Sequence, residues 1–238
     1  MILDKYVASI DSTIPRSYQL LKSAELRCYL PVSLETKPFT TRPMLDAIVS
    51  WITDNFGGCA IFVADSIHRL TLQITRNLSP HEAKEEAYRL GSRFLEENRD
   101  LFANQNGCRF ELLRASSVER MSESAEAKKV LESLFRTNTE FASSIKSTAA
   151  SFIDRRFKNQ TEFCVDRSEM MNLSCLYLIE EIALFSCLVK MGWGIDVYPG
   201  EELPVLIEIA EGKYPDVPAE LRSRVNIALK LKRVQQSG

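Results

Sequence analysis

The chain has 238 residues, of which 45% are hydrophobic, so it is long enough to bury one sizeable core and requires no second domain. Its 30 basic and 32 acidic residues give a net charge of −2 and a pI of about 5.9. This balance excludes a general attraction to polyanions, so any contact with nucleic acid must come from a local cluster of basic side chains.

Two kinds of apolar pattern alternate along the chain. Short apolar runs predict strands at residues 26–32, 59–65, 109–114, 194–198 and 225–234. Helical spacing of apolar residues predicts helices at residues 42–56, 79–102, 122–156, 166–192 and 203–211.

Particular residues mark where these elements end. Gly57 and Gly58 should end the first helix, and a break in the third is expected near residues 137–138. Asp166 is typical of a helix N-cap and Gly192 of a helix end. Charged alternate positions predict that the last strand lies at the edge of a sheet.

Strands that alternate with helices predict an α/β fold. We expect a single domain over residues 1–238, with a mostly parallel sheet and helices on both faces. In such sheets ligands bind beyond the carboxyl ends of the strands. The residues that follow the predicted strands there are Ser33, residues 65–68 and Tyr198. Spacing alone does not show whether they meet.

Several chemistries are disfavoured by what the sequence holds. Six cysteines without a C-x-x-C pair predict buried free thiols, not disulfides or zinc ligands, at positions 28, 59, 108, 164, 175 and 187. Two histidines, His68 and His81, leave acid–base work to Tyr, Glu or Asp. The N-terminal segment has no signal-peptide pattern, and no uncharged apolar stretch is long enough to span a membrane, so we expect a cytoplasmic protein.

Common nucleotide-binding and hydrolase motifs are absent. The sequence contains no G-x-G-x-x-G after its first strand, no G-x-x-x-x-G-K-[ST] and no G-x-S-x-G. This disfavours dinucleotide oxidoreductases, P-loop NTPases and α/β-hydrolases.

The helix at 166–192 carries the most informative side chains. It is nearly all apolar in its second half, which predicts burial on most sides. Tyr177 and Glu181 are four residues apart and share one face, whereas Glu180 points about 100° away. A lone buried carboxylate is unfavourable. Either Glu181, beside the Tyr177 hydroxyl, receives a cationic or polar ligand group, or one glutamate reaches the rim or pairs with an arginine.

From about residue 26 onward the chain resembles the cyclodipeptide synthases. Residues 177–185, YLIEEIALF, are similar to the Y-x-x-x-E helix of that family, and VYPG at 197–200, followed by EELP, is similar to a second segment. YLPVS at 29–33 lies where the family has a strand that ends in its nucleophilic serine. Pro199 after Tyr198, and Thr36 three residues after Ser33, resemble the subgroup with an X-Tyr-Pro signature.

This resemblance implies a Rossmann-like domain similar to the catalytic domain of class I aminoacyl-tRNA synthetases. Members of the family join two amino acids, each delivered on tRNA, into a 2,5-diketopiperazine. An aminoacyl ester is already activated, so its transfer to a serine needs no ATP, and the vicinal ribose hydroxyl can help to carry the proton. The resemblance thus implies two aminoacyl-tRNA substrates, no metal or other cofactor, and a monomer.

The resemblance also implies roles for particular residues. Ser33 would be the nucleophile, Tyr177 and Glu181 would bind the ammonium of the first aminoacyl group, and Tyr198 would relay a proton in the closing step. By their offsets from these residues, the first side-chain pocket would be lined by Tyr29, Pro31, Leu184 and Asp196, and the second would include Thr36 and Phe62. Pro31 departs from the usual glycine, and the bulk of Tyr29 predicts a small first amino acid.

A surface that binds tRNA is harder to place. Several family members use a strongly basic helix after the second strand, but here residues 81–100 are net acidic. Two basic clusters remain as candidates: Lys146, Arg155, Arg156, Lys158 and Arg167; and Arg222, Arg224, Lys230, Lys232 and Arg233. Each could equally be an ordinary solvated face. The alternative function is a non-catalytic, synthetase-like module that binds tRNA or an amino compound.

Overall fold

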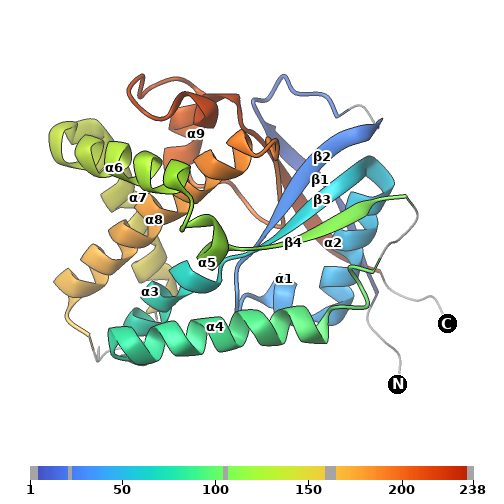
Figure 1. Ribbon diagram of the computed structural model, residues 1–238, viewed down its shortest axis with the longest axis horizontal. Helices are drawn as coiled ribbons and strands as arrows, with labels where there is room; N and C mark the ends of the chain where they lie inside the picture. The colour runs from blue at the N-terminus through green and yellow to red at the C-terminus, as the bar shows by residue number, and fades with distance from the viewer. Residues whose placement is uncertain (1–4, 21–22, 104–106, 159–164, 235–238) are drawn as a thin grey trace.

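The protein is built on one six-stranded sheet (Figure 1). The computed structural model describes residues 5–20, 23–103, 107–158 and 165–234. The strands lie in the order β1-β6-β5-β2-β3-β4. All neighbouring pairs are parallel except β1 with β6. Their bounds are β1 Lys5–Ile14, β2 Ser23–Val32, β3 Phe56–Val63, β4 Arg109–Arg114, β5 Ile195–Tyr198 and β6 Val225–Val234.

Helices cover both faces of the sheet, which confirms the predicted fold class (Figure 1). They are α1 Lys37–Thr40, α2 Arg42–Asn55, α3 Asp65–Arg76, α4 Pro80–Glu97, α5 Ala115–Val118, α6 Ser122–Thr137, α7 Thr139–Arg156, α8 Arg167–Lys190, α9 Pro204–Ala210 and the 3-10 helix Ala219–Ser223. Alternation along the strands separates the two cores. Tyr29 and Phe62 face α6 to α9, whereas Cys28 and Leu30 face α2.

The break between α6 and α7 and both ends of α8 lie where the sequence predicted them, whereas α4 ends at Glu97, before the predicted residue 102. Asn138 separates α6 from α7, and its side chain accepts a hydrogen bond of 3.0 Å from the amide of Phe141. Asp166 caps α8 by accepting from the amides of the first turn. Gly192 follows α8 with a φ of +88°, a conformation that favours glycine. By length and composition alone α8 could cross a membrane, but 67% of its apolar stretch is buried, as in a core helix.

Two long elements, β1 and α3, were not predicted, and neither were the short helices α1, α5 and Ala219–Ser223. The strand β1 was missed because its exposed apolar residues, Val7 and Ile10, are three positions apart among polar residues, which hides a period of two. The helix α3 was missed because Thr71, Ile74 and Thr75 are β-branched and disfavour a helix in isolation. Tertiary packing overrides that preference, since one side of α3 is buried from Ile67 to Ile74.

Two predictions were wrong. Gly57 and Gly58 do not end a helix; they lie inside β3, so that strand begins at Phe56 and ends before Asp65. The strand β6 is not an edge, because it lies between β5 and β1. Its charged residues are exposed because β5 pairs with it only as far as Ala228, and beyond that point β1 alone pairs with it. The edges of the sheet are β1 and β4.

The cysteine prediction is confirmed for five positions, Cys28, Cys59, Cys108, Cys175 and Cys187, which are buried and free. Cys164 lies outside the described residues. Within the described ranges, no three His, Cys, Asp or Glu side chains are arranged to hold a metal ion.

Candidate active site

The candidate nucleophile Ser33 lies in a tight turn directly after β2. The backbone amide of Thr36 donates to the carbonyl oxygen of Ser33 at 3.3 Å, and the Thr36 hydroxyl donates to the same oxygen at 2.8 Å. Glu35 adopts a φ of +66° within this turn. A residue with a side chain is unfavourable in that conformation, so the surrounding structure must stabilise it.

Two side chains from α3 hold Glu35 in place. Nε2 of His68 lies 3.1 Å from one carboxylate oxygen of Glu35, and Arg76 pairs with the other. Arg76 also reaches Glu86 on α4, at 3.0 Å. The hydrogen bond to His68 holds the pKa of Glu35 below its usual range. A second, unpredicted layer of residues thus fixes the turn that carries Ser33.

Tyr177 and Glu181 meet Ser33 from α8. The Tyr177 hydroxyl donates to Glu181 at 3.1 Å, as their spacing on the helix predicted. Burial raises the pKa of Tyr177 and of Tyr198, and the Ser33 hydroxyl lies close enough to both phenols to oppose this rise. Each of the four residues keeps some surface exposed to solvent, although the ionisable groups of Tyr177 and Glu181 lie deep enough for burial to raise their pKa. The fold therefore brings together the four residues that sequence spacing alone could not connect.

The protonation of this cluster follows from its burial. Burial raises the pKa of Glu181 to about 8; the Tyr177 hydrogen bond opposes this rise, and the carboxylates of Glu202 and Asp196 add to it. Burial also raises the pKa of Tyr177 and of Tyr198. At neutral pH both tyrosines are therefore protonated hydrogen-bond donors, and Glu181 exchanges its proton near the pH at which an α-amino group does.

A buried ionic cluster lies beside Glu181. Arg224, which directly precedes β6, pairs with Asp196 and Glu202, and donates to the Tyr29 hydroxyl at 3.3 Å. Burial raises the pKa of Asp196, against the effect of Arg224. Arg224 thus pairs directly with two carboxyl groups, while the third, Glu181, lies near enough for the same guanidinium to act on its pKa, which burial raises. This arrangement favours the arrival of a further positive charge.

This ionic cluster corrects the prediction made for Arg224 and adds Arg224 and Glu202 to the residues of the candidate site. Arg224 was a candidate for a basic surface, but it is only 5% exposed and belongs to the interior. Glu202 had no predicted role, although it lies in the EELP segment. Its position after the VYPG turn was a signal, but only contacts in the fold show that it reaches Arg224.

The predicted pocket residues divide by exposure. Tyr29, Pro31, Phe62 and Asp196 are buried, whereas Thr36 is partly exposed in the Ser33 turn. Leu184 lies in the wall of a separate cavity of about 420 Å³, on the side of α8 that carries Glu180.

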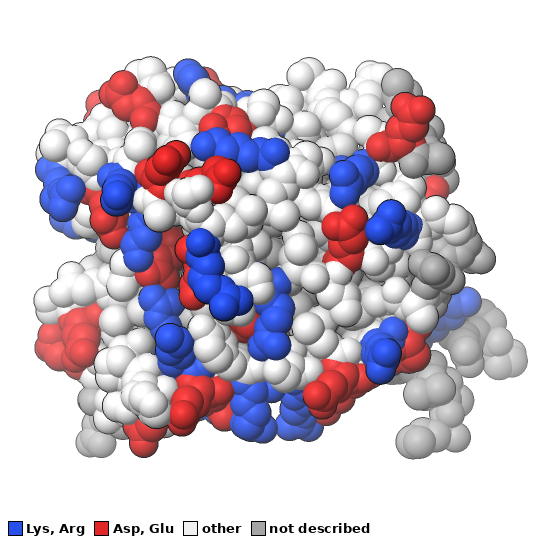
Figure 2. Space-filling model, in the orientation of Figure 1, with Lys and Arg blue, Asp and Glu red and all other residues white. Residues whose placement is uncertain are grey.

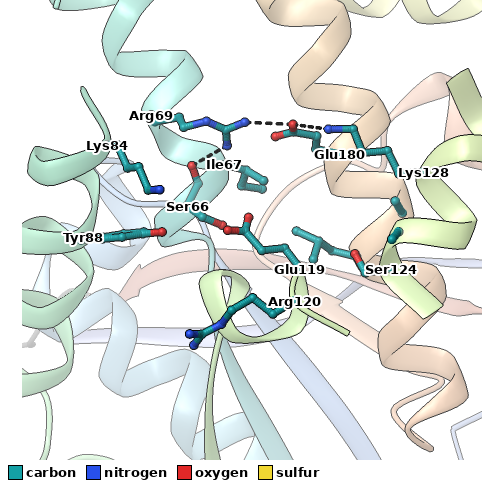
Figure 3. Close-up of a pocket in the computed structure, with 13 residues that line it drawn as sticks. Ser66, Ile67, Arg69, Lys84, Tyr88, Glu119, Arg120, Ser124, Lys128 and Glu180 are labelled. Carbon is teal, nitrogen blue, oxygen red and sulfur yellow. Dashed lines mark hydrogen bonds and ion pairs between the residues drawn. The ribbon is translucent and has the colours of Figure 1, made fainter. Parts of the chain in front are cut away.

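That separate cavity explains Glu180 (Figure 3). Arg69 from α3 and Lys128 from α6 approach Glu180 from opposite sides and bond to its Oε1 at 2.9 and 2.7 Å. Glu180 therefore pairs with an arginine, which was one of the two readings of the glutamate pair. Lys84 and Arg120 also line the cavity and form no ion pair within the part of the chain described.

The basic clusters proposed from the sequence are solvent-exposed in part. Arg155 and Arg156 end α7, and Arg155 is close enough to Tyr198 to act weakly on its pKa, which burial raises. Lys158 and Lys232 are exposed, Lys230 pairs with Asp11 at 3.2 Å, and Arg233 is also exposed. On the face in Figure 2, basic and acidic side chains are interspersed, so this face has no uniformly basic surface.

No protein-family model and no curated protein sequence matches the chain. Solved structures of cyclodipeptide synthases share its fold. That of Fluoribacter dumoffii aligns with a TM-score of 0.81 at 20% identity, over 98% of this chain and 100% of its own. The cyclodipeptide synthase of Bacillus thermoamylovorans aligns with a TM-score of 0.71 at 13% identity, over 89% of this chain and 90% of its own. The cyclodipeptide synthase of Candidatus Glomeribacter gigasporarum, bound to Phe-tRNAPhe, aligns with a TM-score of 0.69 at 16% identity, over 92% of this chain and 91% of its own.

Proposed function

We propose that this protein is a tRNA-dependent cyclodipeptide synthase that works through a covalent ester on Ser33. The observation that carries the proposal is the meeting of Ser33 with Tyr177, Tyr198 and Glu181 at the carboxyl edge of the sheet. A fold shared with cyclodipeptide synthases over nearly the whole chain supports it, as does the Pro199 that follows Tyr198, typical of the X-Tyr-Pro subgroup.

The first step is acyl transfer from the first aminoacyl-tRNA. The Ser33 oxygen attacks the ester carbonyl, the bond to the terminal ribose oxygen breaks, and the serine proton passes to that ribose through its vicinal hydroxyl. Tyr177 and Tyr198 are protonated, so they orient the Ser33 hydroxyl and do not act as its base. The carboxylate of Glu181 and the hydroxyl of Tyr177 bind the substrate ammonium.

The second and third steps form the two peptide bonds. The amine of aminoacyl-Ser33 attacks the ester of the second aminoacyl-tRNA, which releases the second tRNA and leaves a dipeptide on Ser33. The new terminal amine then attacks the Ser33 ester, closes the diketopiperazine and returns the oxygen to the enzyme. Each amine must first lose a proton, and Glu181, with its pKa raised to about 8, is suited to accept it. Tyr198 relays a proton in the closing step.

The tRNA would approach past the end of α7. Arg155 lies near Tyr198, and Arg155, Arg156 and Lys158 are exposed there. Phosphates of the acceptor arm would meet these cations while its aminoacyl end reaches Ser33. Lys230, Lys232 and Arg233 offer a second contact farther along the sheet.

The decisive experiment is mass spectrometry of the medium of a bacterium that expresses the chain, searched for all diketopiperazine masses. Ser33→Ala should abolish the product, and Ser117→Ala, a change at an exposed serine of α5, should retain it. Purified protein mixed with total charged tRNA should gain one aminoacyl mass, which Ser33→Ala should lose. Soluble, folded protein that yields neither the product nor the covalent adduct would favour the non-catalytic binding module.

A further inference from the structure

The reactive side chains and the pocket side chains differ in their access to solvent. Ser33, Tyr177, Glu181 and Tyr198 are partly exposed, so a substrate can reach them. The neighbouring side chains that would receive the first amino acid's side chain are closed off: Tyr29 is 0% exposed and Asp196 2%. A pocket that admitted even one water molecule would leave these side chains measurably exposed.

The space is filled by the protein's own groups. The guanidinium of Arg224 lies over the ring of Phe185, 5.2 Å from its centroid, and the Phe185 ring is 5.7 Å from that of Tyr29. Arg224 is fixed at the same time by Asp196, Glu202 and the Tyr29 hydroxyl. Because Arg224 pairs with both Asp196 and Glu202, moving it aside for a larger ligand would leave these buried carboxylates unpaired.

The sheet places these groups in one row. Tyr29 on β2 pairs directly with Asp196 on β5, and Asp196 pairs with Asn226 on β6. The amide of Val225 donates to the carbonyl of Gly194 at 2.9 Å, which fixes the start of β6 next to Arg224. Tyr29 and Asp196 therefore stand on central, paired strands, and Arg224 directly precedes another, so this part of the site is held more rigidly than a loop would be.

We propose that the first aminoacyl group taken by this protein is glycyl or alanyl, and that Tyr29 and Arg224 set this limit. The proposal rests on the proposed function and names the substrate class of the same site. A hydrogen or a methyl group fits beside an ammonium bound between Tyr177 and Glu181, while a branched or aromatic side chain meets the ring of Tyr29 and the fixed guanidinium. Arg224 already donates to Asp196, Glu202 and the Tyr29 hydroxyl, so its charge is committed to partners within the protein.

The test uses one tRNA body charged in turn with glycine, alanine, valine, leucine or phenylalanine, so that the RNA contacts stay constant. The rate at which Ser33 gains the aminoacyl mass is followed by intact-protein mass spectrometry. We expect glycyl and alanyl groups to transfer at least about tenfold faster than the others, the discrimination that a small hydrophobic pocket provides. Leucyl or phenylalanyl transfer at an equal rate would overturn the inference and leave the proposed function standing. Absence of transfer from all five would overturn both.

Variants of Tyr29 locate the limit. Tyr29→Ala should admit valyl and leucyl groups by opening the space, and Tyr29→Phe, which keeps the ring and loses the hydroxyl, should retain the preference for small residues. A Tyr29→Ala protein that folds and keeps the original preference would remove Tyr29 from the proposal. If Tyr29→Ala does not fold, the wild-type series decides the question by itself.

Discussion

Glu180 and Glu181 are consecutive residues of α8 in opposite electrostatic surroundings. Glu180 accepts hydrogen bonds from the cations of Arg69 and Lys128. Glu181 accepts one from the neutral hydroxyl of Tyr177 and lies near the carboxyl groups of Glu202 and Asp196, which are themselves paired with the nearby Arg224. One glutamate is compensated by the protein, and the other is left to be compensated by a ligand.

This contrast makes the two glutamates matched controls for each other. Glu180→Gln removes the shared partner of two cations, so we expect the free energy of unfolding to fall by about 1–3 kcal/mol, with the rate of acyl transfer unchanged. Glu181→Gln removes the carboxylate that binds the ammonium, so we expect acyl transfer to fall roughly 100-fold, the effect of losing a charged hydrogen bond of about 2–3 kcal/mol. Urea unfolding and single-turnover transfer measure the two effects. Equal losses of activity would contradict the division of roles.

The raised pKa of Glu181 predicts a dependence of stability on pH. Its pKa in the folded protein, about 8, is higher than the value of about 4.3 expected in the unfolded chain. The folded state therefore binds a proton more tightly. The stabilising effect is complete below pH 4 and is lost as the pH rises through 8. Between pH 5 and 9 we expect the free energy of unfolding of the wild type to fall, relative to that of Glu181→Gln, by on the order of a few kcal/mol. The melting temperature of the wild type should fall relative to that of the variant over the same range. Parallel curves for the two proteins would exclude this shift.

Most of the sheet could be predicted from the sequence because each central strand is a short apolar run between turn residues. The strand β1 could not, since its pairing with β6 is made by distant residues and its own pattern is polar. The same reason applies to α3, whose β-branched residues are helical only because α4 and α8 pack against them. Long-range packing, which one sequence does not display, decided both.

The residues of the candidate site also fall into those that the sequence could predict and those that it could not. The pair Tyr177 and Glu181 could be predicted from helical spacing, and Ser33 and Tyr198 from their places after strands. The residues that surround these four, and that set the charge near Glu181 and the shape of the Ser33 turn, could not be predicted. Arg224 reads as a surface cation in the sequence and is buried in the fold, and Glu35 reads as an ordinary loop residue although its φ is +66°. Each depends on partners that are distant in the chain, His68 for Glu35 and Asp196 for Arg224.

The hydroxyl of Tyr177 should act on Glu181 as well as on the substrate. Its hydrogen bond lowers the pKa of Glu181 against the effect of burial. Tyr177→Phe should therefore raise the pKa of Glu181 further, so that less carboxylate is present at neutral pH, and the loss should be partly recovered at higher pH. We expect kcat/KM to fall about tenfold or more at pH 7 and its pH profile to shift upward. A uniform loss at every pH would show that Tyr177 acts on the substrate alone.

The turn that carries Ser33 gives a last prediction, because Glu35 combines an unfavourable φ with contacts to His68 and Arg76. Glu35→Ala loses the partners His68 and Arg76 and keeps a side chain at φ +66°, whereas Glu35→Gly loses the same partners and tolerates that φ. We expect both variants to transfer acyl groups more slowly, since the turn that positions Ser33 is no longer held. We expect Glu35→Ala to be less stable than Glu35→Gly by about 1 kcal/mol, the difference due to the backbone alone. Urea unfolding with single-turnover kinetics separates the two effects. If the alanine variant were as stable as the glycine variant, the turn would have relaxed out of the left-handed conformation, and the hydrogen bonds of Thr36 to Ser33 would alone have to hold the nucleophile.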